Sequence, residues 1–117
     1  MAGKTLIDLE LETLKEWKKY YDNPRFYIEK VKALARKHDK QARVMLFGSI
    51  IKGNMRPNSD IDVLLITRLA ENVDDRIKLR VEISREIGDS TPFEIHIITP
   101  REYENWYKRF IDKYLEL

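Results

Sequence analysis

The stretch GSIIKGNMRPNSDIDVLLI, residues 48–66, contains the features that decide the fold. It joins a Gly-Ser pair, a polar loop and an apolar run that opens with Asp60 and Asp62. Upstream, the apolar run 42–47 ends abruptly at Gly48, and a third apolar run covers 92–99. Short apolar runs rich in branched residues and bounded by turn residues are typical of buried strands. We therefore expect strands at 42–47, 60–67 and 92–99.

Helical patterns surround these expected strands. Apolar residues recur at spacings of three and four over 5–21 and 24–38, and Pro24 suits a first helical turn. Residues 72–87 alternate apolar and charged residues as a surface strand would, but Asn72 as an N-cap favours a helix. A helix is also expected over 100–115, with an aromatic stripe that we interpret as a core face rather than a partner surface. The stripe consists of Tyr103, Trp106, Tyr107, Phe110, Ile111, Tyr114 and Leu115.

Together these segments predict one domain over residues 1–117, of the α+β class with α/β-type layers. We expect a small mixed β-sheet with helices packed on it. At 117 residues the chain is long enough for one core but too short for a separate substrate-binding domain. The acceptor of any reaction should therefore be held largely by something else.

Charge and composition argue against several kinds of binding partner and binding site. Lysine and arginine (22) barely exceed aspartate and glutamate (20), so no strong basic field favours nucleic-acid binding. The absence of cysteine excludes disulfides and thiolate metal sites. No apolar run approaches the roughly 18 residues of a membrane helix. We therefore expect a cytoplasmic protein that does not bind membranes.

The residues around Gly48 and Asp62 have the chemistry to bind phosphate and metal. Gly48 permits a tight turn, and Ser49 can begin a helical turn whose free N–H groups accept phosphate oxygens. Asp60 and Asp62, two apart on a strand, point to the same face with Cα atoms roughly 6.6 Å apart. Two carboxylates so placed repel each other unless a cation lies between them, and Mg²⁺ prefers carboxylate and phosphate oxygens. The implied reaction is nucleotidyl transfer.

A third carboxylate on another expected strand can complete this site. Glu94 shares a strand face with His96 and Ile98, while Phe93 and Ile95 point the other way. We expect Glu94 to be a metal ligand and to accept the proton of the attacking hydroxyl, although an edge strand could also present it to water. His96 is interpreted as structural, because one histidine without a second ligand nearby is a weak metal site.

The pattern Gly-Ser, Lys-Gly and Ser-Asp-Ile-Asp resembles the minimal nucleotidyltransferase family of the DNA polymerase beta superfamily. The resemblance implies the nucleotidyltransferase fold and an enzyme that uses Mg²⁺, as one ion or two, with ATP or another NTP. The family more often has aspartate at the position of Glu94 and arginine at that of Lys52. The catalytic residues and metal ligands that the resemblance implies are Asp60, Asp62 and Glu94. The nucleotide-binding residues that it implies are Gly48, Ser49, Lys52, Gly53 and Ser59.

The same resemblance suggests a protein partner. Members of this family are often paired with HEPN-domain toxins, and some transfer AMP to a tyrosine of the toxin. A HEPN-domain partner as acceptor is therefore the leading interpretation, with homo- or hetero-oligomers both open. The alternative is an antitoxin-like binding module that neutralises its partner by contact and has a vestigial or regulatory nucleotide site. A subunit of a drug- or RNA-modifying transferase ranks lower, because the chain lacks an extra domain and a basic surface.

Overall fold

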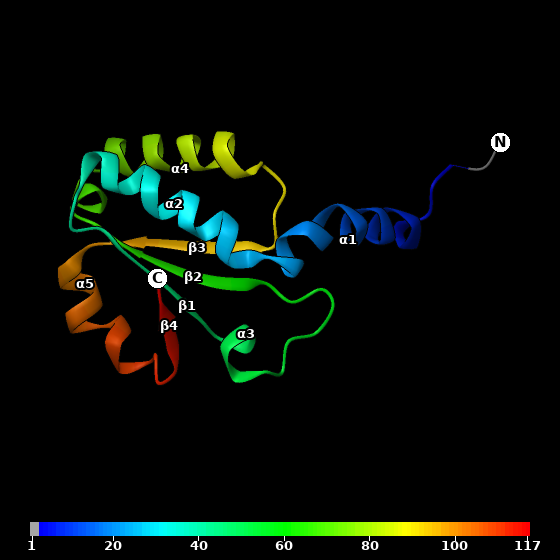
Figure 1. The fold of residues 1–117 in the computed structure, drawn as a ribbon. Coiled ribbons are helices and arrows are strands. Elements are labelled where there is room, and N and C mark those ends of the chain that lie inside the picture. The colour runs from blue at the N-terminus through cyan, green and yellow to red at the C-terminus, as the bar shows by residue number, and fades with distance from the viewer. Residues whose placement is uncertain (1–2) are drawn as a thin grey trace.

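A computed structural model describes residues 3–117 and shows a four-stranded mixed sheet with helices on both faces (Figure 1). The strand order is β3-β2-β1-β4. The strands are β1 (Arg43–Phe47), β2 (Ile61–Ile66), β3 (Phe93–Ile98) and β4 (Tyr114–Glu116). The helices are α1 (Leu6–Asp22), α2 (Pro24–His38), α3 (Ser49–Lys52), η1 (Arg68–Glu71), α4 (Val73–Ile87), α5 (Pro100–Asn105) and η2 (Tyr107–Arg109). The expected fold class is confirmed.

Strand direction determines which ends of the strands meet. β1 and β2 are antiparallel, and the loop that connects them contains α3. β2 and β3 are parallel, and the connection between them contains α4. In this register Phe47 lies opposite Asp62, and Asp62 lies opposite Glu94. The end of β1 and the starts of β2 and β3 therefore lie along one edge of the sheet, the edge formed by strand ends. The polar residues of the sequence motif gather there.

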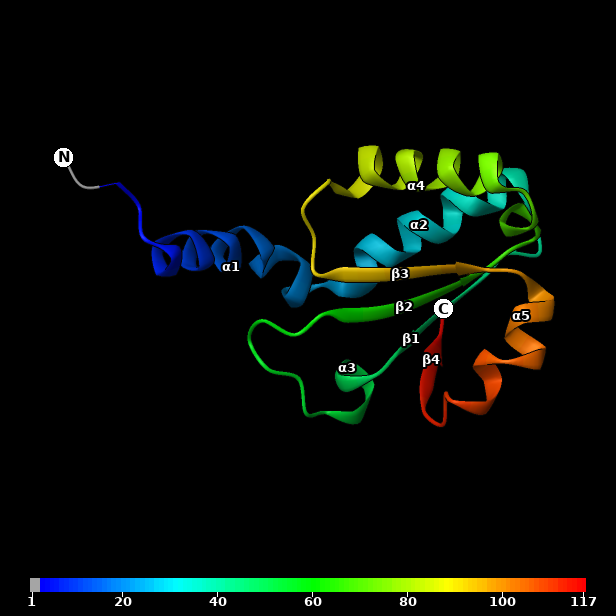
Figure 2. The same cartoon turned by 180° about the vertical axis from the view of Figure 1, so that it is seen from behind.

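The two faces of the sheet are covered differently. Helices α2 and α4 pack on one face, and α5 packs on the other, as Figures 1 and 2 both show. On the α2/α4 face, Val63 and Leu65 belong to the larger core, which also contains Ile28 and Leu79. The α5 face has a smaller core of buried residues, which are Met45, Leu64, Ile66, Ile98 and Tyr103. The side chains of Asp62, Glu94 and His96 point to this second, less covered face.

Local capping explains most helix boundaries. The ambiguous segment 72–87 is a helix, because the Asn72 side chain accepts a hydrogen bond from Asp75 N–H (3.1 Å) and Gly88 follows the last turn. Thr5 and Asp8 form a capping box at the start of α1, and Asn23 caps α2 ahead of Pro24. These are local signals, so the sequence reveals them.

The expected C-terminal helix over 100–115 is wrong beyond its first turns. Helix α5 ends at Asn105, a short 3-10 turn follows, and residues 114–116 form β4 along the open edge of β1. Arg43 binds Glu116 through two hydrogen bonds of 2.8 Å, and Leu117 N–H donates to Val44 O at 3.0 Å. Without β4, the outer side of β1 would present unpaired backbone N–H and C=O groups. Pairing with β4 satisfies these groups, which a helix over the same residues would not do.

The aromatic stripe is therefore split between core and surface. Tyr103 is buried, whereas Trp106 and Phe110 are 59% and 68% exposed and stack on each other. Interpretation of the whole stripe as a core face is wrong, because the helix that would align it does not continue.

A buried aspartate joins the end of α2 to the end of β2. Asp39 is 2% exposed, and its carboxylate accepts hydrogen bonds from Thr67 Oγ1 (2.8 Å), Arg68 N–H (3.1 Å) and Gln41 N–H (3.1 Å). Burial alone would raise the pKa of Asp39, but these hydrogen bonds and the charge of Arg68 together outweigh burial and hold the pKa below its usual value. Because the folded pKa is lowered, the ionised group stabilises the fold above the unfolded pKa and loses that effect as pH falls.

We expect Asp39→Ala to lower the free energy of unfolding by about 2–3 kcal/mol at pH 7, since it leaves buried donors unpaired. The difference from wild type should begin to shrink below about pH 4, where Asp39 of the unfolded wild type binds a proton, and shrink further as pH falls toward the lowered folded pKa. Urea unfolding at pH 7 and pH 3.5 measures both quantities, and the exposed Asp89→Ala is the control. A pH-independent difference would show that Asp39 acts by packing rather than by charge.

Candidate active site

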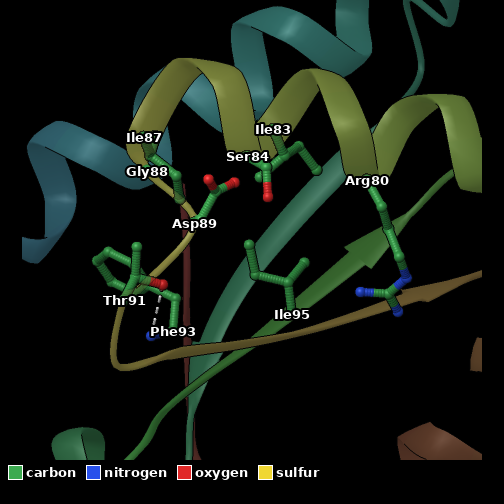
Figure 3. A pocket seen from close by; sticks show the side chains of 9 residues that line it. All are labelled: Arg80, Ile83, Ser84, Ile87, Gly88, Asp89, Thr91, Phe93 and Ile95. Carbon is green, nitrogen blue, oxygen red and sulfur yellow. Dashed lines mark hydrogen bonds between the residues drawn. The ribbon is translucent and has the colours of Figure 1, made fainter.

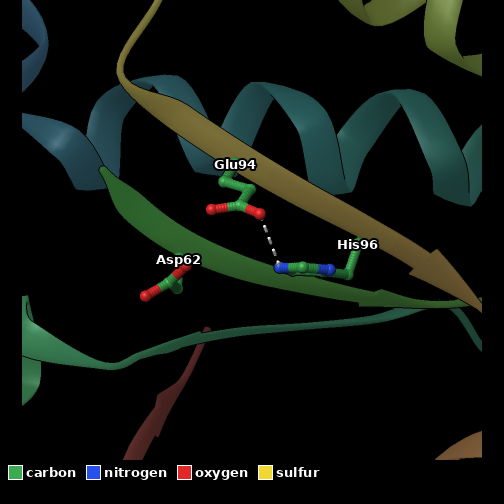
Figure 4. Close-up of side chains that lie close together, drawn as sticks. All are labelled: Asp62, Glu94 and His96. Carbon is green, nitrogen blue, oxygen red and sulfur yellow. Dashed lines mark ion pairs between the residues drawn. The ribbon is translucent and has the colours of Figure 1, made fainter.

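The polar edge of the sheet brings three potential metal ligands together. Asp62, Glu94 and His96 each offer one ligand atom, and these atoms lie within 4.8 Å of one another (Figure 4). Glu94 Oε1 is 3.7 Å from His96 Nε2. The cause is the parallel register, which sets Asp62 opposite Glu94 while His96 follows Glu94 by two residues on the same face. It is the one such group of three found among residues 3–117.

The surroundings of Asp62 raise the pKa of its carboxyl group. Partial burial raises its pKa, and the negative charges of Glu94 and then Asp60 raise it further, while His96 opposes them. A carboxylate in this environment is stabilised by a cation. Two carboxylates and an imidazole within reach of one another are ligands of the kinds that divalent metal ions use. The two carboxylates therefore fit the Mg²⁺ that the sequence pattern implies.

Gly48 lies directly against Asp62. Its backbone has φ +78° and ψ −150°, a conformation that is essentially limited to glycine. A Cβ atom built on Gly48 would lie 2.3 Å from Asp62 Oδ2, so the space beside the carboxylate requires glycine. Ser49 begins α3, and the first N–H groups of a helix have no partner within it. The structure thus places the expected Gly-Ser turn beside Asp62.

The other residues predicted around the nucleotide lie in or near the 53–60 loop. Ser59 Oγ accepts from Arg56 N–H at 2.9 Å, so this hydroxyl is engaged in folding the loop. Gly53 ends α3 in a left-handed conformation with open space around it. Lys52 lies at the end of α3, with its Nζ 3.8 Å from Asp112 Oδ1. Asp60 is exposed, precedes β2 by one residue and is outside the group of three. Its role as a metal ligand stays a prediction.

Two residues at this edge were not assigned to the site by sequence reasoning. Tyr21, on α1, donates from its hydroxyl to Ser59 O at 2.7 Å and so holds the loop that leads into the aspartates. Burial and the charge of Asp60 raise the pKa of Tyr21. His96 was expected to be structural because no second ligand was thought to be near, and that premise is wrong. The face that His96 shares with Glu94 was the available signal.

A separate cavity of about 200 Å³ lies between α4 and β3 (Figure 3). Phe93 and Ile95 line it from β3, and these side chains point to the face opposite Glu94 and His96. Arg80 and Asp89 lie at its rim. The strand therefore separates this cavity from the carboxylate cluster, and it is not part of the candidate site.

A mixed sheet with carboxylates beside a Gly-Ser turn is compatible with enzymes that transfer phosphorus-containing groups. Residues 28–114 match the family described as nucleotidyltransferase domain, which is well over half of the chain. The protein belongs to this family.

Individual relatives agree with the family. Spectinomycin 9-adenylyltransferase of Enterococcus faecalis is 32% identical over 99 residues, covering 76% of this chain. The chain spans only 38% of the length of that relative. A crystal structure provisionally assigned as a nucleotidyltransferase has a TM-score of 0.64 and 32% identity, covering 77% of this chain and 96% of the other.

A second solved structure, from Sulfolobus solfataricus and assigned in the same provisional way, has a TM-score of 0.51. It is 23% identical and covers 98% of this chain and 87% of the other, so it supports the fold alone. Within residues 3–117, every helix is too short or too polar to span a membrane.

Proposed function

We propose that the protein is a Mg²⁺-dependent nucleotidyltransferase that transfers a nucleoside monophosphate, AMP from ATP in the first instance, to a hydroxyl group. The observation that supports the proposal is the position of Gly48 against Asp62, which sets the Gly-Ser turn, our proposed phosphate-binding element, beside the carboxylate cluster. Asp62 and Glu94, with Asp60, are the proposed metal ligands. A bound divalent cation would neutralise the phosphate charge and polarise the α-phosphate.

The chain's own residues have distinct tasks in this proposal. Gly48 and Ser49 bind phosphate oxygens through backbone N–H groups, and Lys52, Gly53 and Ser59 complete the nucleotide site. Glu94 accepts the proton of the acceptor hydroxyl. The acceptor oxygen then forms a bond to the α-phosphorus as the bond to the β-phosphate oxygen breaks, and pyrophosphate leaves. Tyr21 positions the 53–60 loop through its hydrogen bond to Ser59.

Helix α1 supports a protein as the acceptor. Its first half extends away from the sheet in both views, and Leu6 and Ile7 are 75% and 68% exposed (Figures 1 and 2). An apolar groove runs along it to Pro57 and Asn58, directly before Ser59 and Asp60. The first half of α1 exposes leucines and protrudes from the core, so contact with a partner would stabilise it. The proposed partner is a HEPN-domain protein, as in the minimal nucleotidyltransferase family.

Radiolabelled ATP tests which phosphate moves. With a candidate HEPN-domain protein added as acceptor, label from α-³²P-ATP should reach that protein, and label from γ-³²P-ATP should not. Transfer of the γ-label would indicate kinase chemistry and would overturn the mechanism. Leu9→Glu on α1 should reduce labelling by weakening docking, while leaving stabilisation of the free protein by Mg²⁺ and ATP unchanged.

Two other outcomes separate the alternatives. Tight binding of the partner with no label from either nucleotide would favour the antitoxin-like binding module, with a vestigial or regulatory nucleotide site. Labelling of spectinomycin instead of protein would favour a small-molecule acceptor, the substrate class in the name of the Enterococcus relative. An acceptor that the enzyme does not hold reacts slowly, because positioning supplies much of the rate.

A further inference from the structure

His96 distinguishes this cluster from a purely carboxylate magnesium site. Mg²⁺ prefers oxygen ligands and is indifferent to a nearby imidazole, whereas Zn²⁺ and Co²⁺ bind imidazole nitrogen well. His96 Nε2 is directed toward Glu94 (Figure 4), and the two ligand atoms are 3.7 Å apart. Ligand atoms on one tetrahedral Zn²⁺ are roughly 3.3 Å apart, given bonds of roughly 2.0 Å. The pair thus needs little movement to share an ion.

The imidazole of His96 is held in place by its surroundings. It is about one-third exposed, and its ring lies near those of Phe47 (centroids 5.9 Å apart) and Tyr107 (6.4 Å). Phe47 belongs to β1 and Tyr107 follows α5, so two separate elements restrict the ring. Restriction of this kind favours metal binding, because a ligand held near its bound orientation loses less entropy when the ion arrives.

We propose that Asp62, Glu94 and His96 form a binding site for Zn²⁺ and similar imidazole-preferring ions, in which His96 supplies the nitrogen ligand. The ion would take three ligands from the protein and leave a position open to water or phosphate, as open zinc sites do. Zn²⁺ would bind here more tightly than Mg²⁺ and compete with it. The inference rests on the proposed function only for the assignment of Asp62 and Glu94 as ligands.

The chain offers an internal control, because it has two histidines in total. His38 also lies near a carboxylate, with Nε2 3.4 Å from Glu82 Oε2. It belongs to no group of three ligands among the described residues. Each histidine therefore has one acidic neighbour, but only His96 has a second carboxylate, that of Asp62, within reach.

Histidine NMR of the wild-type protein tests the proposal without nucleotide or turnover. The imidazole C–H signals are assigned by comparison with His38→Asn, and ZnCl₂ is added to metal-free protein. The His96 signals should shift and those of His38 should stay within experimental error up to one equivalent. A shift of His38 alone, or of neither histidine, would overturn the proposal.

Affinity measurements give the second test. His96→Asn should weaken Zn²⁺ binding by at least about 10- to 100-fold, the loss that removal of even a hydrogen-bonding partner of a metal ligand causes, and His38→Asn should not. The visible spectrum of bound Co²⁺ should change in the first variant alone. Unchanged Zn²⁺ affinity in His96→Asn would contradict the proposal, whereas absence of nucleotidyl transfer in wild type would contradict only the proposed function.

Discussion

Gly48→Ala should reduce nucleotidyl transfer about 10²-fold or more, because a displacement of reacting groups by about 1 Å is enough for such a loss. The new Cβ would lie 2.3 Å from Asp62 Oδ2, and contact at that distance forces either the carboxylate or the start of α3 to move. Both belong to the proposed site. The φ of +78° with ψ of −150° adds backbone strain of about 1–3 kcal/mol in an alanine.

Gly53→Ala is the matched control. Gly53 has nearly the same φ, +77°, but its ψ of 14° lies in the left-handed helical region, and a Cβ added there would meet no atom within 4 Å beyond its chain neighbours. Alanine there should cost about 1 kcal/mol of stability. It keeps the backbone, the only part that Gly53 can offer the nucleotide, so transfer should stay within a few-fold of wild type. Rates are compared with α-³²P-ATP, and thermal unfolding measures stability. Similar losses of transfer in both variants would show that flexibility of the 48–53 segment matters rather than the space beside Asp62.

Much of this fold is visible in the sequence because β1, β2 and β3 are short and mostly apolar. The runs 42–47, 60–67 and 92–99 contain β1, β2 and β3 with ends one residue or less from the structure. Helix 72–87 was ambiguous by periodicity, and Asn72 decided it correctly because an N-cap is a local interaction. Features set by contacts within a few residues are therefore predictable from this chain.

Features set by distant contacts are not. Residues 114–116 carry helix-compatible spacing, yet they pair with β1, about seventy positions earlier. Nothing near Tyr114 in the chain reports that β1 has an open edge. The Arg43–Glu116 pair has the same origin, since neither residue indicates its partner by sequence position.

The candidate site also combines features that the sequence predicts with features that depend on distant contacts. Period-two alternation showed that Glu94 and His96 share a face, and that two aspartates stand at the start of β2. It did not show that β2 and β3 are adjacent and parallel in a register that sets Asp62 opposite Glu94. That long-range fact makes His96 a neighbour of two carboxylates. It also leaves Asp60 outside the closest group, although the sequence spacing treats both aspartates alike.

Asp62→Asn should abolish metal-dependent transfer and yet raise the stability of the metal-free protein. The pKa of Asp62 is raised by burial and by the charges of Glu94 and Asp60. A carboxyl whose folded pKa is raised costs stability while it is ionised, and the cost disappears as pH falls through that pKa. The amide removes this charge at nearly the same volume, so metal-free Asp62→Asn should melt above wild type at pH 7, with a smaller difference at low pH.

With Mg²⁺ and ATP the order should reverse. Ligand at 100 times its dissociation constant stabilises a protein by about 2.7 kcal/mol, and wild type should gain this while the variant gains little. Loss of a metal ligand removes several kcal/mol of transition-state stabilisation, so transfer should fall about 10³-fold or more. Asp60→Asn separates the two effects, because Asp60 is exposed. It should lower transfer without stabilising the metal-free protein. If Asp62→Asn melts below wild type without metal but keeps its stabilisation by Mg²⁺ and ATP, then Asp62 supports the fold and does not bind the ion.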